Sequence, residues 1–179
     1  MNYYELNLCG IKRNLPIIEV SKNLDIASFV LLGDQEICTL SAKNLSEKMP
    51  DVDLLVTAEA KGIPLVNEIA RLKNMPKYVV ARKSVKVYMD DPLSVEVDSI
   101  TTANIQKLYL AKEDAILLKG KKIALVDDVI STGQSIGALE ELVKKAGGNV
   151  VARVAILAEG DAANRQDIIF LEKLPIFPK

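Results

Sequence analysis

Lys122-Ile-Ala-Leu-Val-Asp-Asp-Val-Ile-Ser-Thr-Gly-Gln-Ser135 contains a complete strand-to-helix junction. Four apolar residues, a length and composition suited to a buried strand, end at the carboxylates Asp127 and Asp128. A turn of small residues then leads into a helical pattern from Gln134 to Ala146, and Gly147-Gly148 supplies the stop. The segment therefore predicts both acids at the carboxyl end of a strand, just before an exposed turn.

The turn after the two carboxylates has the chemistry of a site for a phosphate monoester. Its backbone N–H groups meet a helix N-terminus, where the helix dipole favours an anion. Ser131, Thr132 and Ser135 add hydroxyl donors. Asp127 and Asp128 can accept hydrogen bonds from sugar hydroxyls or bind Mg²⁺ through water. The spacing is neither that of a P-loop nor that of a GxGxxG loop. We expect phosphate, ribose and metal at one turn; the plain alternative is a strand end followed by a helix cap.

Short apolar runs alternate with helical patterns along the rest of the chain. Residues 63–73 place Leu65, Val66 and Ile69 around one side of a helix, with Pro64 in its first turn. Strand and helix repeated in this way predict an α/β fold, a mostly parallel twisted sheet with helices on both faces. The other expected strands are Leu54 to Thr57, Tyr78 to Ala81, Val150 to Leu157 and Ile168 to Leu171.

The segment from Leu93 to Ala111 follows a different pattern. Val95 and Val97 alternate with polar residues, and apolar positions resume after the polar stretch 101–104. This predicts a two-stranded ribbon with a polar tip. Because an isolated ribbon is only marginally stable, we expect a movable flap, with an ordinary surface hairpin as the alternative.

Two further loops place positive charge beside the expected sheet edge. In Ala58-Glu59-Ala60-Lys61-Gly62 a strand ends and a glycine precedes a helix, so that backbone donors and the Lys61 ammonium can meet an anion. Arg82 and Lys83 follow the next apolar strand at the same end of the sheet, where ligands of open α/β folds collect. Both loops are expected to bind an anion, although turns with solvated surface charges would read the same way.

The composition excludes several classes of protein. A chain of 179 residues with 49% hydrophobic residues can bury one core, which predicts a single domain. A net charge of -1 without a basic run argues against nucleic-acid binding. The absence of histidine excludes histidine acid/base chemistry, and Cys9 and Cys38 lack metal-ligand spacing. No apolar stretch is long enough for a membrane span, so we expect a cytoplasmic protein.

Leu125-Val-Asp-Asp-Val-Ile-Ser-Thr-Gly133 resembles the motif with which type I phosphoribosyltransferases bind 5-phosphoribosyl 1-pyrophosphate (PRPP). Residues 56–64 resemble the family's pyrophosphate loop, residues 80–83 its next strand end, and residues 93–111 its catalytic flap. The pattern is most similar to adenine and xanthine phosphoribosyltransferases and to the purine-repressor effector domain. The resemblance implies one domain over residues 1–179, with a hood from 1–45 and 158–179 and a flap from 84–111.

The resemblance also implies an activity: transfer of the phosphoribosyl group from PRPP to a purine base, with Mg²⁺, in a homodimer. Asp127 and Asp128 would hold the ribose and, through water, the metal, while Lys61 and Arg82 would offset the leaving-group charge. A cis peptide bond is expected at Glu59–Ala60. The residues implied to bind substrate are Glu59, Ala60, Gly62, Lys83, Lys86, Val129, Ile130, Ser131, Thr132, Gly133, Gln134, Ser135 and Asp25.

Adenine is the expected base. The acidic turn 159–161 lacks a donor for a 6-oxo group, and Asp25 in the hood could accept from an exocyclic amino group. However, Lys86-Val87-Tyr88 stands where adenine enzymes have another pattern. Xanthine and orotate remain alternative bases; orotate is favoured by residues 60–64 but not by the flap. A PRPP-sensing regulator without catalysis is a further alternative, although the chain shows no basic recognition helix.

Overall fold

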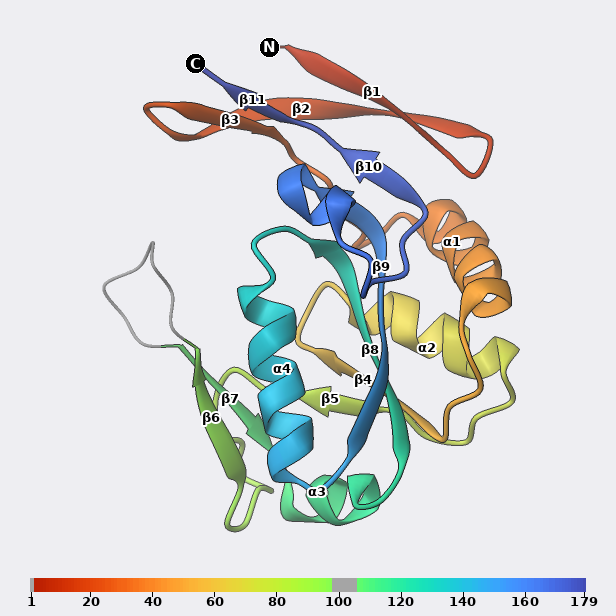
Figure 1. Cartoon of the computed structure of the whole chain (residues 1–179), viewed down its shortest axis with the longest axis vertical. Coiled ribbons are helices and arrows are strands. Elements are labelled where there is room, and N and C mark those ends of the chain that lie inside the picture. The colour runs from red at the N-terminus through yellow and green to blue at the C-terminus, as the bar shows by residue number, and fades with distance from the viewer. Residues whose placement is uncertain (1, 98–105) are drawn as a thin grey trace.

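A five-stranded parallel sheet forms the centre of the molecule (Figure 1). The computed structural model describes residues 2–97 and 106–179. The strand order is β10-β9-β8-β4-β5, and every neighbouring pair is parallel. This arrangement confirms the α/β class and the parallel sheet. The strands are β4 (Leu54–Ala58), β5 (Val79–Ala81), β8 (Lys122–Ile130), β9 (Asn149–Glu159) and β10 (Glu172–Leu174).

Helices cover both faces of this sheet because its strands are apolar on both sides. In β8, Ala124 and Val126 join the apolar cluster under α1 (Gln35–Lys48) and α2 (Ile63–Leu72). Ile123 and Leu125 join the cluster on the other face, under α4 (Gln134–Lys145) and α3 (Lys112–Leu118). The central strand is thereby fixed from both sides, and its carboxyl end is held rigidly.

A second, antiparallel sheet joins the two ends of the chain (Figure 1). Its order is β1-β2-β3-β11, so the last strand pairs with an early one. The Lys179 ammonium pairs with Glu19 and, at 2.9 Å, with Asp25. The C-terminal strand is thus tied to the N-terminal hairpin by backbone and charge together. The strands are β1 (Tyr3–Leu8), β2 (Ile11–Ser21), β3 (Leu24–Ala27) and β11 (Ile176–Pro178).

The expected ribbon is present as the antiparallel pair β6 (Leu93–Val97) and β7 (Gln106–Leu110). Its base packs on the α4 face of the molecule, where Val95 and Leu108 are buried. The expected polar tip at 101–104 lies outside the described residues.

One expected strand was wrong. Residues 168–171 form a single bridge, from Ile169 to Val154, and the regular strand β10 begins only at Glu172. The backbone still follows β9, since the Leu171 N–H donates to the Ile156 carbonyl at 3.0 Å. A short 3₁₀ helix, η1 (Gly160–Asn164), lies between β9 and residues 168–171 in the sequence. In the described part of the chain no helix has the length and apolar character that crossing a membrane requires.

Candidate active site

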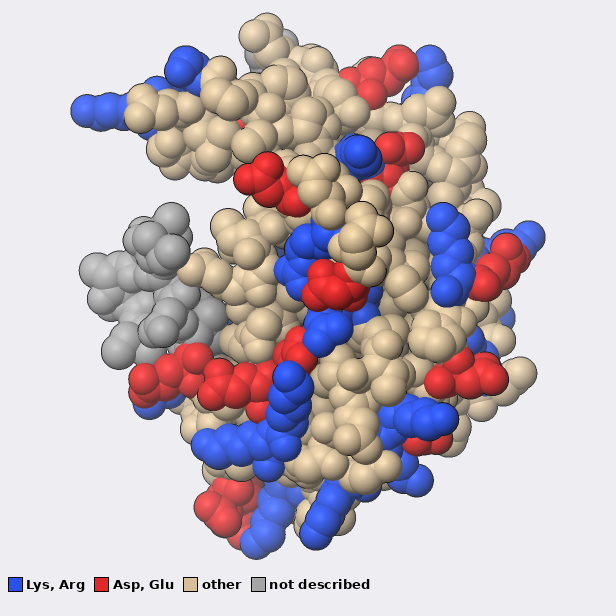
Figure 2. Space-filling model, viewed as in Figure 1, with Lys and Arg blue, Asp and Glu red and all other residues tan. Residues whose placement is uncertain are grey.

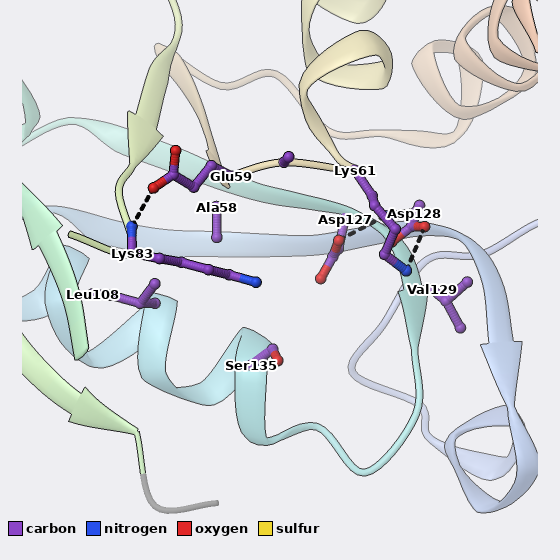
Figure 3. A pocket seen from close by; sticks show the side chains of 10 residues that line it. Ala58, Glu59, Lys61, Lys83, Leu108, Asp127, Asp128, Val129 and Ser135 are labelled. Atoms are coloured by element: carbon purple, nitrogen blue, oxygen red, sulfur yellow. Dashed lines mark hydrogen bonds and ion pairs between the residues drawn. The ribbon is translucent and has the colours of Figure 1, made fainter. Parts of the chain in front are cut away.

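The carboxyl ends of β4, β5 and β8 meet at one edge of the sheet, and a cavity of about 190 Å³ lies there (Figure 3). Parallel strands place the loops that follow them side by side, so segments more than 60 residues apart in sequence share one cavity. The lining residues are Ala58, Glu59, Ala60, Lys61, Lys83, Leu108, Asp127, Asp128, Val129 and Ser135.

A smaller cavity, of about 80 Å³, lies over the turn between β8 and α4. Gly133 caps the helix with φ = +84°, a conformation that favours glycine. The backbone of the turn lies at the N-terminus of a 12-residue helix, and this arrangement suits the binding of an anion. The lining residues are Asp127, Val129, Ile130, Ser131, Thr132, Gly133, Ser135 and Ile136.

The two carboxylates at the end of β8 differ in environment. Asp128 is 2% exposed, and its Oδ2 lies 3.0 Å from Lys61 Nζ. The Asp128 N–H donates to Asp127 Oδ1 at 2.8 Å. Burial, followed by the negative charge of Asp128, raises the pKa of Asp127 to about 7. Asp127 is therefore the carboxylate of this pair that takes up a proton near neutral pH.

The loop after β4 packs tightly against Thr57 of its own strand and against the backbone of β8, which favours glycine at position 62. A Cβ on Gly62 would lie 2.2 Å from Thr57 Oγ1 and 3.3 Å from the Val126 carbonyl oxygen. Earlier in the same loop, the Glu59–Ala60 peptide bond is cis, as the resemblance implied. The loop thus brings Lys61 directly over the end of the neighbouring strand.

Glu59 ties this loop to the segment after β5. Its carboxylate accepts from the Lys83 N–H at 2.5 Å and from Arg82 Nε at 2.9 Å. Although burial opposes ionisation, these hydrogen bonds lower the pKa of Glu59. Arg82 Nη1 also donates to the Tyr88 hydroxyl at 2.7 Å. The Arg82 guanidinium is therefore engaged by the protein, whereas the Lys83 side chain extends into the cavity (Figure 3).

The two cavities bring together most of the residues that the sequence singled out. Arg82, Lys86, Gly62, Gln134 and Asp25 are not among the lining residues. Asp25 lies in β3 of the antiparallel sheet, where its carboxylate pairs with Lys179. Leu108 of the ribbon lines the cavity and was not anticipated, although its apolar position in the ribbon was visible in the sequence.

The carboxylate pair fits a magnesium ion that is shared with a phosphorylated ligand. Mg²⁺ in proteins commonly takes one or two carboxylates and completes its shell with phosphate oxygens and water. Asp128 Oδ2 is buried and has the Lys61 ammonium as an ion-pair partner, and Asp127 lies on the cavity wall. Over residues 2–97 and 106–179 no cluster of three metal-ligating acids, cysteines or histidines is found, so the pair would supply only part of a coordination shell.

The model of the phosphoribosyl transferase domain matches residues 33–174, which include both loops and the carboxylate pair. The chain belongs to this family. It is 36% identical, over 115 residues, to a protein of Ferroglobus placidus named hypoxanthine/guanine phosphoribosyltransferase, covering 64% of this chain and 57% of that one. With the protein of the same name from Methanothermococcus okinawensis the identity is 32% over 131 residues, covering 73% and 67%. The phosphoribosyltransferase chain thus spans little more than half the length of the first of these relatives.

Solved structures of the family share the fold. The adenine phosphoribosyltransferase of Thermoanaerobacter pseudethanolicus superposes with a TM-score of 0.70 at 23% identity, covering 89% of this chain and 95% of that one. The Giardia lamblia enzyme complexed with 9-deazaadenine gives a TM-score of 0.68 at 17% identity, covering 89% and 93%. At these identities the similarity extends to the architecture, including the parallel sheet and its covering helices.

The raised pKa of Asp127 makes the stability of the ligand-free protein depend on pH. The contribution of Asp127 to the free energy of unfolding is fully present below pH 3.8, the ordinary pKa of an aspartate, and is lost as the pH rises through about 7. Asp127→Asn stays neutral, so above pH 7.5 (roughly) its free energy of unfolding should exceed that of wild type by up to about 4 kcal/mol, since the pKa of Asp127 is raised by about 3 units and one unit corresponds to about 1.4 kcal/mol. Thermal unfolding in chelator between acidic and alkaline pH measures this. The exposed Asp51→Asn controls for loss of one surface charge, and parallel curves for wild type and Asp127→Asn would contradict the assignment.

Proposed function

We propose that the protein is a purine phosphoribosyltransferase, which transfers the 5-phosphoribosyl group of PRPP to a ring nitrogen of a purine and releases pyrophosphate. The observation that carries the proposal is the juxtaposition of two anion-binding loops around one carboxylate pair, within a chain of this family. PRPP has the matching order of groups, with a phosphate at one end, ribose hydroxyls in the middle and a pyrophosphate at the other end.

Each part of PRPP has a proposed partner. The 5′-phosphate would accept from the backbone and hydroxyl groups of Ser131 to Ser135, at the N-terminus of α4. The ribose hydroxyls would donate to Asp127 and Asp128 at the end of β8. The pyrophosphate would lie against the loop 58–62 and the Lys83 ammonium. Bound in this way, the ribose C1 lies between the carboxylates and the leaving group.

Electrostatics explains how such a site could accelerate transfer. Cleavage of the bond between C1 and pyrophosphate leaves positive charge on the ribose and negative charge on the departing oxygens. Fixed charges aimed at those positions stabilise the transition state because they need no reorganisation. Asp127 and Asp128 would face the cationic sugar, and Lys61 and Lys83 the leaving group. When bound, Mg²⁺ would neutralise further pyrophosphate charge, and Asp127 and Asp128 are the residues that would hold it.

Exclusion of water is the proposed task of the flap, residues 84–111. Leu108 brings an apolar side chain from β7 to the cavity wall. Closing an apolar cover over PRPP would limit its hydrolysis while the base binds.

Residues 1–179 are proposed to work as one domain in a homodimer. The segment after Arg82 exposes the apolar side chains of Val85, Val87 and Tyr88. Apolar side chains gathered on one segment suit a subunit contact.

Two observations favour different bases. The sequence relatives are named hypoxanthine/guanine phosphoribosyltransferases, which supports a 6-oxopurine. Acidic Glu159 ends β9 and acidic Asp161 lies in η1, and their carboxylates would accept from the amino group of adenine. Asp25 is less available as an acceptor for the amino group of adenine, because its carboxylate already pairs with Lys179. We place a 6-oxopurine first and adenine second.

Replacing both acids by amides should abolish transfer and leave the fold intact. In Asp127→Asn combined with Asp128→Asn, the ribose loses its carboxylate acceptors and the metal its charged ligands, so kcat/KM should fall at least ~100-fold. Steady-state kinetics with PRPP, Mg²⁺ and a purine, together with circular dichroism, measures this. Asp51→Asn is the matched surface control. Near-normal turnover by the folded double variant would refute the assigned site.

Lys83 and Arg82 should differ sharply in function. Lys83→Met removes a cation from the cavity, so we expect kcat/KM to fall by about 10- to 100-fold, the effect of losing a charge-assisted contact worth about 1.5 to 3 kcal/mol. Arg82→Met breaks the contact with Glu59 and should lower thermal stability more than Lys83→Met does. Kinetics and melting curves of both variants measure this contrast. A larger kinetic loss in Arg82→Met, without loss of stability, would reverse the assignment.

A base panel distinguishes the two candidate bases. We expect kcat/KM for hypoxanthine or guanine to exceed that for adenine, xanthine and orotate at the same PRPP and Mg²⁺ concentrations. A site built to pair with one exocyclic group rejects an analogue that leaves the buried partner unpaired. Asp25→Ala should change none of these ratios by more than about twofold, because its partner is Lys179. A preference for adenine that Asp25→Ala abolishes would restore Asp25 as the base acceptor.

A further inference from the structure

Arg165 occupies the space next to Gly133 where any other residue would carry a side chain. A Cβ built on Gly133 would lie 2.6 Å from Arg165 Nη1 and 3.8 Å from its Cζ. Arg165 directly follows η1, beyond the end of β9, whereas Gly133 belongs to the turn between β8 and α4. The guanidinium therefore packs on the backbone of the turn that we propose to bind the 5′-phosphate.

Asp167 holds the guanidinium in this position. Arg165 Nε donates to Asp167 Oδ1 at 2.9 Å, and Nη2 donates to Oδ2 at 2.7 Å. This two-pronged pairing fixes the plane of the group. Nη1, the nitrogen nearest Gly133, makes no hydrogen bond to the described residues. Two of the three guanidinium nitrogens thus orient the third toward the turn.

A second ion pair connects α4 to β9, the strand that leads to the segment with Arg165 and Asp167. Arg153 of β9 donates to both carboxylate oxygens of Glu140 in α4, at 2.7 and 2.6 Å. Charge from Asp167 acts on Arg153, and charge from Glu140 acts on Arg165. The ion pair between Glu140 and Arg153 ties α4 to β9, the strand that precedes η1 and Arg165. Figure 2 shows basic and acidic side chains interleaved over α4 and the neighbouring strands.

The guanidinium of Arg165 lies beside the N-terminus of α4, and Asp167 offsets its charge there. The N-terminus of α4 already carries the positive end of the helix dipole, and a guanidinium beside it adds repulsion. A phosphate in the cavity over the turn would reverse the sign of both interactions. Asp167 stabilises the charge of Arg165 in the ligand-free protein, and a bound phosphate would be a further favourable partner for it.

We infer that Arg165 is a positioning residue for the phosphate-binding turn: its guanidinium, clamped by Asp167, supports Gly133 from outside the cavity and adds positive charge behind the site of the 5′-phosphate. The inference rests on the proposed function, since it assigns the phosphate to this turn. Arg165 acts through the turn, because it does not line either cavity in the described part of the chain.

Two probes separate the two ends of PRPP. Arg165→Met keeps an unbranched apolar side chain but loses the charge and the fork. Its dissociation constant for ribose 5-phosphate should rise by about 3- to 30-fold, the range expected for a charge at a helix N-terminus. Its dissociation constant for pyrophosphate with Mg²⁺ should change by less than about twofold, because that anion is proposed to bind the other loop. KM for PRPP should rise with kcat nearly unchanged, as for a loss of uniform binding.

Matched variants supply the controls. Arg71→Met removes another arginine that pairs two-pronged with an acid, Glu68, at 3.0 and 2.7 Å on α2. It should leave both dissociation constants unchanged. Arg165→Lys should recover part of the loss because it retains the charge, and Asp167→Asn should reproduce a smaller loss because it frees the fork. These two variants keep the inference testable if Arg165→Met is poorly folded.

Three outcomes would overturn the inference. Unchanged ribose 5-phosphate binding in folded Arg165→Met would show that the turn does not depend on the guanidinium. Equal weakening of both probes, accompanied by a lower Tm, would show a merely structural role. Wild-type protein that binds neither probe would overturn the proposed function and, with it, this inference. In the first two outcomes wild-type binding remains, so the failure concerns Arg165 alone.

Discussion

The contact between Gly62 and the backbone of β8 is the constraint on which the site depends. A methyl group on Gly62 would displace the Thr57 hydroxyl and would lie in tight contact, at 3.3 Å, with the Val126 carbonyl oxygen of β8. This approach brings Lys61 within 3.0 Å of the buried Asp128. Without it, the end of β8 would hold two carboxylates and no cation, in a region where burial already penalises negative charge. The packing of one glycine thus permits the acidic pair to be buried.

The charges around the cavity show a division between structural and ligand-facing roles. Glu59 and Arg82 pair with each other, which fixes the segment after β5 against the loop after β4. Lys83, one residue further, is left with its ammonium in the cavity. Adjacent basic residues can therefore have different tasks, because alternate side chains at a strand end point in opposite directions. Lys83 is thereby available to the negative charge of a ligand in the cavity.

The strand and the helix that position the carboxylate pair and the turn before α4 are packed firmly into the fold. Both faces of β8 are buried under helices, and α4 is linked to β9 by the ion pair between Glu140 and Arg153. The turn that begins α4 consequently has a fixed start and a fixed end. The ribbon rests on α4 through Val95 and Leu108. The Lys145 ammonium also donates to the Ser94 carbonyl at 2.9 Å, and Tyr109 forms a bridge with Arg82, the residue after β5. The buried sheet thus forms the floor of the cavity, and Leu108 of the ribbon contributes to its wall.

The sequence by itself determined the parallel sheet, the two loop-to-helix junctions and the acids at the end of β8, because apolar strand runs, glycine turns and helix starts are local signals. It also marked Lys61, Lys83 and the turn from Ser131 to Ser135 as neighbours of one sheet edge. Only the tertiary structure decided which charges are free. Arg82 is engaged by Glu59, Asp25 by Lys179, and Arg165 by Asp167 beside the turn that begins α4. The first two pairings join residues that are far apart in the sequence, and the position of the third beside Gly133 also depends on side-chain directions and distances that no local pattern encodes.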